Sequence, residues 1–151
     1  MSAFVTAGAG FLLAVLWFDL MFDVQVLRRG DGDLPEPVLE SISAYYRRVT
    51  TAARPMNRLI AAVMLATLAA IVVQIARGDA PRWVGWACLV LAAAAVLLAA
   101  GRTLPSAVRL GAGSDPVEVR SRLARSIWRD HLLCLAAIAS VLVLQLAFAA
   151  S

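Results

Sequence analysis

Apolar residues fill four long runs of the chain, and the polar residues gather between them. The runs cover about residues 3–27, 56–76, 83–101 and 131–150. A bilayer core about 30 Å thick takes about 20 helical residues, so each run is long enough, or nearly so, to cross a membrane. The pattern predicts one all-α integral membrane domain over residues 1–151, folded as a four-helix transmembrane bundle.

Two of the polar segments between the runs resemble each other. Residues 28–35 read RRGDGDLP and residues 109–116 read RLGAGSDP, 81 positions later and without a gap. Each segment follows an apolar run and precedes a polar helix. A repeat of this length predicts two copies of one helical hairpin, the first over about residues 3–76 and the second over about residues 83–151.

The first polar segment predicts a Gly-rich turn over residues 28–33 and then a short helix. Pro35 and Pro37 suit the start of a helix. Residues 38–54 are typical of a helix, and Pro55 is expected to end or kink it just before the second span.

The second copy predicts a similar plan with a longer helix. Gly111 and Gly113 are expected to form the turn, and Pro116 suits the first helical position. The helix that follows should run through Trp128 and continue into the fourth span without a break.

The arginines predict the orientation of the spans. The chain is 62% hydrophobic, and all 14 basic residues are arginine. Six lie in or beside the first loop, two beside the second and six in or beside the third. By the positive-inside rule, the first and third loops face the cytoplasm and both termini face outward.

Composition also indicates a location and a set of partners. Abundant alanine without lysine is typical of a GC-rich bacterial genome, so we expect a multi-pass protein of the bacterial inner membrane. The net charge of +4 follows from topology, and we expect no nucleic-acid partner. The expected partners are the lipid bilayer and either a second copy of the chain or another membrane protein.

Small and amide side chains predict how the spans pack. Small residues in the first span (residues 7–10) and the third (residues 92–95) let helix backbones approach closely. Gln74 and Gln145 lie in the outer halves of their spans, where they can bond across helices. Cys88 and Cys134 should differ in depth by more than about 10 Å, beyond the reach of a disulfide.

Asp19 and Asp23 are the sharpest local signal for a site. They lie four residues apart on one face of the first span, and ionisable groups within a span are costly to bury. They indicate either salt bridges to interfacial arginines or a ligand, proton or metal site. For Asp19, the cationic partners at matching depth are Arg58, Arg102 and His131.

Other polar side chains are expected at the same depth and predict a polar pocket at the cytoplasmic mouth of the bundle. The candidate ligand or proton site residues are Asp19, Asp23, Asn57, Arg58, Arg102, Trp128 and His131. The sequence has no paired histidines, metal-type cysteine spacing or nucleophile elbow, so no metal or catalytic residue is assigned and the cofactor stays open.

The third loop and the fourth span resemble a known family. They read TLPSAVRL at residues 103–110, DP at 115–116 and SIWRDH at 126–131, followed by an apolar run. This pattern is similar to the C-terminal part of small four-span bacterial membrane proteins grouped with anthrone oxygenases, through Pro105, Trp128 and His131. The resemblance implies an oxygenase acting on a lipophilic substrate.

Three functions follow from these features. The first is a small membrane bundle that binds a lipophilic ligand or a partner protein, which the sparse catalytic inventory favours. The second is a membrane oxidoreductase or oxygenase whose site is lined by Asp19, Asp23, Trp128 and His131. The third is a proton-coupled transporter that uses Asp19, since some transporters are built from repeats of the same orientation.

Overall fold

The computed structural model describes residues 1–29 and 32–148, which are almost entirely helical and include no strand. The helices are α1 (Ser2–Asp23), α2 (Glu36–Arg47), α3 (Arg54–Arg77), α4 (Arg82–Leu98), α5 (Leu104–Ala112) and α6 (Val117–Phe148). A 3₁₀ turn, η1 (Val24–Arg29), follows α1, and π-helical turns η2 (Arg48–Ala52) and η3 (Ala99–Thr103) follow α2 and α4.

Four helical segments among the described residues are long and apolar enough to cross a membrane, which confirms the predicted helical membrane bundle. They are Ser2–Leu27, Pro55–Arg77, Arg82–Ala112 and Val117–Phe148. The third and fourth are longer than their apolar runs, because the helices continue on both sides of the loop that joins them. Helix α6 runs unbroken through Trp128, as predicted.

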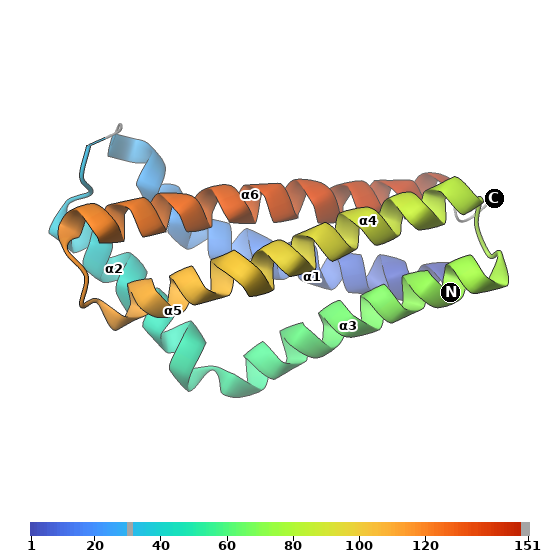
Figure 1. Cartoon of the computed structure of the whole chain (residues 1–151), viewed down its shortest axis with the longest axis horizontal. Helices are drawn as coiled ribbons and strands as arrows, with labels where there is room; N and C mark the ends of the chain where they lie inside the picture. Colours follow the sequence, from blue (N-terminus) through green and yellow to red (C-terminus); the bar gives the residue numbers. More distant parts are fainter. Residues whose placement is uncertain (30–31, 149–151) are drawn as a thin grey trace.

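The long helices lie roughly along one direction, and α2 crosses one end of the bundle (Figure 1). We call this end, formed by η1, α2, η2, α5 and the start of α6, the arginine-rich end. Met1 and the end of α6 lie at the opposite end of the bundle (Figure 1). The two arginine-rich loops therefore share one end, as the arginine distribution predicts.

Two apolar cores hold the fold together. The bundle core joins α1, α3, α4 and α6 around Val5, Leu12, Ile71, Ile138 and Val141. It also contains the small residues Ala9, Ala92 and Ala95, so part of each predicted small-residue surface is buried. A second core lies beneath α2 at the arginine-rich end and contains Leu34, Leu39, Ile42, Leu110 and Ile127.

Helix α3 diverges from the bundle toward the arginine-rich end (Figure 1). None of the described side chains over residues 55–66 is buried, whereas Thr67, Ala70, Ile71 and Gln74 are. Its outer half is therefore packed, and its half near α2 is left largely uncovered.

A buried amide pair fixes the outer half of α3 to α6. The side chains of Gln74 and Gln145 donate to each other at 3.0 and 3.1 Å, and Gln145 also donates to the sulfur of Cys88 at 3.4 Å. This confirms the predicted bond across helices. Cys88 and Cys134 are both free and buried, as expected from their different depths.

Replacing either glutamine with leucine should lower the free energy of unfolding by about 1–2 kcal/mol, because one amide is left without its partner in an apolar core. The Gln74→Leu/Gln145→Leu double variant should lose less than the sum of the single variants. Thermal unfolding in detergent measures all three. Strictly additive losses would show that the two amides are not coupled.

The polar segments only partly follow their predicted plan. Helix α5 ends at Ala112 and is capped by Gly113, whose φ of +67° suits glycine, but Gly111 lies inside α5 rather than in a turn. The first predicted turn includes Gly30 and Asp31, which lie outside the described residues. The helical conformation is interrupted at Ala53, two residues before Pro55, as expected.

The hairpin duplication stays a prediction. Pro35 and Pro116 each directly precede a helix, in keeping with an equivalent position in two copies. The halves then differ, because α2 is followed by a π turn and a break before α3, whereas α6 continues into its span.

Candidate functional site

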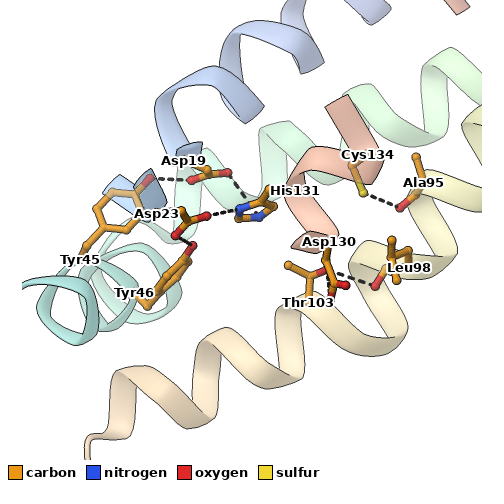
Figure 2. Close-up of polar contacts among 10 residues, drawn as sticks. All are labelled: Asp19, Asp23, Tyr45, Tyr46, Ala95, Leu98, Thr103, Asp130, His131 and Cys134. Carbon is orange, nitrogen blue, oxygen red and sulfur yellow. Dashed lines mark hydrogen bonds and ion pairs between the residues drawn. The ribbon is translucent and has the colours of Figure 1, made fainter. Parts of the chain in front are cut away.

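Two acids on α1 meet two tyrosines on α2 at the arginine-rich end (Figure 2). The Tyr45 hydroxyl donates to Asp19 Oδ1 at 2.6 Å, and the Tyr46 hydroxyl donates to Asp23 Oδ1 at 2.6 Å. The acids are one helical turn apart and the tyrosines are consecutive, so one end of α2 is bonded to one face of α1.

His131 of α6 completes this group between the two acids (Figure 2). Its Nδ1 lies 2.6 Å from Asp23 Oδ2, and its Nε2 lies 3.9 Å from Asp19 Oδ2. Asp23 is 1% exposed and His131 is 7% exposed. We call Asp19, Asp23, Tyr45, Tyr46 and His131 the Asp–His–Tyr cluster.

The two phenols act as donors in this cluster. Burial and the Asp19 carboxylate raise the pKa of Tyr45, and burial and the Asp23 carboxylate raise the pKa of Tyr46. Both hydroxyls therefore stay protonated at physiological pH. The ring of Tyr45 also stacks on Phe22, with a centroid separation of 4.0 Å, which fixes its direction.

The sequence of α2 accounts for its position across the bundle. Leu39, Ile42, Ser43 and Tyr46 share one helical face and are buried. At its end, α2 approaches α5 so closely that a Cβ on Gly111 would lie 2.8 Å from the backbone nitrogen of Arg47. Only a glycine in α5 permits this contact.

The start of α6 holds the chain that leads into α2. Arg120 donates twice to the Glu36 carboxylate, at 2.6 and 2.8 Å, and the backbone N–H of Leu34 donates to the Ser121 hydroxyl at 2.9 Å. Helix α2 is thus fixed at its beginning by α6 and at its end by α1, α5 and α6.

A second polar group lies one residue before His131. The Asp130 carboxylate is buried, and its Oδ2 lies 3.2 Å from Arg102 Nε and 3.4 Å from the Thr103 hydroxyl. Arg102 also donates to the Ser126 hydroxyl at 2.9 Å. Asp130 Oδ1 has no hydrogen-bond partner among the described residues. The π turn η3 supplies both Arg102 and Thr103 to this group.

The predicted site residues lie in several separate places. Asp19, Asp23 and His131 come together, and of the three cations considered for Asp19 the structure brings His131 to it. Arg102 pairs with Asp130 instead. The side-chain amide of Asn57 donates to the Val49 carbonyl at 2.6 Å, next to the break before α3. Arg58 is exposed on α3, and Trp128 is half-buried on α6.

Asp19, Asp23 and His131 contact one another, and the polar pocket at this end of the bundle stays a prediction. The groove described in the structure lies instead between the outer halves of α1 and α3, with a volume of about 380 Å³. It is lined mainly by apolar side chains, among them Phe4, Gly8, Val63, Ala66 and Val73. No group of three His, Cys, Asp or Glu side chains in the described part of the chain is arranged to hold a metal ion.

Sequence reasoning missed the tyrosines as members of the site. Two consecutive aromatics beside arginines suggest membrane-interface anchors, and nothing in their spacing indicates acceptors on another helix. A usable signal was present, because buried acids in a span need donors and the only two tyrosines of the chain are adjacent in the first loop.

Comparisons with known proteins correct two predictions. A family model described as SHR3 chaperone, ER membrane protein SH3, matches residues 1–149. No curated protein and no solved structure matches the chain. The resemblance to anthrone oxygenases is therefore wrong. It rested on a proline in the first turn of α5 and on a tryptophan and a histidine near the start of the last apolar run, residue types that many membrane helices share.

The predicted bacterial inner-membrane location is also wrong, because the matching family is described as an ER membrane protein. The prediction rested on abundant alanine and the absence of lysine, and such a composition does not distinguish one kind of membrane from another. Since the match extends over nearly the whole chain, this protein belongs to the SHR3 chaperone family.

Proposed function

We propose that this chain is a chaperone of the endoplasmic-reticulum membrane that binds transmembrane helices of a partner membrane protein. The observation that carries the proposal is the family match over residues 1–149. The bonds of Tyr45, Tyr46 and Glu36 hold α2 in position across the end of the bundle.

The groove between α1 and α3 supports this proposal as a place for a partner helix. Its walls include Gly8 on α1 and Ala66, Ala69 and Ala70 on α3. Small residues let helix backbones approach closely in lipid, where no hydrophobic difference drives helices together. The volume of about 380 Å³ suits a few side chains of a helix that packs against the opening.

The uncovered half of α3 supports the same reading. Its large apolar side chains Met56, Leu59 and Leu65 are 47–65% exposed. A partner helix that packs beside α3 would cover both this half and the groove, which together form one side of the bundle.

A photoreactive amino acid placed at Ala66, in the groove, tests the proposal in ER membranes. We expect adducts to multi-span membrane proteins in clear excess over those from the same probe at Leu97, which is 72% exposed on α4. A bulky Ala66→Trp change should reduce adducts from a probe at Phe4 on the opposite wall.

The control variant Leu97→Trp should leave the Phe4 adducts unchanged. Equal protein adducts from both probe positions would contradict a partner site at the groove. Adducts to lipid alone would show that the groove is a lipid site and would also contradict the proposal.

A further inference from the structure

We propose that Asp19, His131 and Asp23 form a proton-binding site whose occupancy controls how α2 is held across the arginine-rich end. The proposal concerns the Asp–His–Tyr cluster and is independent of partner binding. It rests on an account of the donors and acceptors that face one another in this buried group.

One proton of His131 is fixed by Asp23. The carboxylate of Asp23 already accepts from the Tyr46 hydroxyl through Oδ1, and its Oδ2 lies 2.6 Å from His131 Nδ1. Two unprotonated acceptors would repel each other at that distance, so a proton lies between them. A neutral histidine that places its only proton there leaves Nε2 as a bare acceptor.

The second proton concerns the other ring nitrogen of His131, which lies at ion-pair distance from Asp19 and not at hydrogen-bond distance. Nε2 faces Asp19 Oδ2 at 3.9 Å, and Asp19 Oδ1 already accepts from the Tyr45 hydroxyl. Without a proton, the lone pair of Nε2 would face a carboxylate oxygen in a buried site. We place this proton on Nε2, which makes His131 an imidazolium held between two carboxylates.

The charges around His131 agree with this assignment. Helix α1 presents Asp19 and Asp23, and α2 presents only the neutral phenols of Tyr45 and Tyr46. On α6 itself, Asp130 is next to His131 and is paired with Arg102 of η3.

With the second proton, the cluster therefore carries one net negative charge, and without it two. Two unbalanced charges are costly in a low-dielectric interior.

Loss of the second proton would act on α2 through Tyr45. Asp19 is the more exposed acid of the cluster, with 19% of its side chain accessible, so it is the route by which a proton exchanges with water. When Nε2 is deprotonated, Asp19 and His131 repel each other, and the Asp19 carboxylate that holds Tyr45 shifts. The end of α2 is then held by Tyr46 and its apolar contacts alone.

His131 is the only histidine of the chain, so nitrogen NMR of histidine-labelled protein reports one imidazole. We expect both ring nitrogens to carry a proton at neutral pH and Nε2 to lose its proton as the pH rises. In Asp19→Asn, that loss should occur at a different pH, because the carboxylate that faces Nε2 has been removed. An unprotonated Nε2 between about pH 5 and 8 in the unaltered chain would overturn the proposal.

Hydrogen exchange of the α2 amides, corrected for intrinsic rates, tests the coupling. Protection over Glu36–Arg47 should fall in the pH range in which Nε2 loses its proton, and the midpoint should move with it in Asp19→Asn. In Tyr45→Phe, the imidazole should still titrate, but α2 protection should no longer follow it. Unchanged protection of α2 while Nε2 titrates in the unaltered chain would overturn the switch.

Discussion

Asp23→Ala is expected to lower the free energy of unfolding by about 3–5 kcal/mol, the cost of breaking a buried ion pair by removing one partner. The carboxylate is 1% exposed and binds Tyr46 and His131 at 2.6 Å each. Its removal leaves a phenol and an imidazole unpaired inside the protein. Thermal unfolding in detergent, followed by circular dichroism, measures the loss.

A matched change at an exposed acid separates this effect from a general effect of charge. Asp33 is exposed in the loop before α2, so Asp33→Ala should change the free energy of unfolding by no more than about 0.5 kcal/mol. If Asp23→Ala and Asp33→Ala had equal effects, the Asp–His–Tyr cluster would contribute little to holding the fold together.

Gly111→Ala is expected to lower the free energy of unfolding by about 1–3 kcal/mol, because overpacking forces the neighbouring backbone to move. The added Cβ would lie 2.8 Å from the backbone nitrogen of Arg47 and 3.0 Å from its Cα. A backbone cannot yield as a flexible side chain can, so α2 must shift away from α5. Proteolysis of the loop before α2 should also become faster.

Gly10→Ala provides the control, because a Cβ at Gly10 meets nothing within 4 Å. This change should be neutral or raise the free energy of unfolding by up to about 1 kcal/mol, through the higher helix propensity of alanine. A Gly111→Ala variant as stable as Gly10→Ala would contradict the close approach of α2 and α5.

Most of the fold could be predicted from hydropathy, since four apolar runs of membrane length leave few folds other than a four-helix membrane bundle. What hydropathy missed is the end of the third span. Helix α5 carries charges that lower its hydropathy, yet it continues the third membrane helix, whereas the continuation of α6 into the fourth span was predicted. The π turn at η3 has no composition that marks it. It depends on tertiary contacts such as that between Thr103 and Asp130.

The candidate site could be predicted from the sequence only in part. Asp19, Asp23 and His131 could be placed at one depth by counting helical residues, and they do meet. Tyr45 and Tyr46 could not, because their positions depend on α2 folding back across the bundle. Asn57 and Arg58 were expected beside this group, but α3 diverges from the bundle at this end, and Asn57 donates to the Val49 carbonyl instead.

The most direct test of the proposed chaperone function measures membrane proteins in cells that lack this chain. We expect a set of multi-span proteins to accumulate in the endoplasmic reticulum. The unaltered chain and Leu97→Trp should restore their exit, and Ala66→Trp, which fills the groove between α1 and α3, should not. Full rescue by Ala66→Trp, or an unchanged distribution of membrane proteins without the chain, would contradict the account.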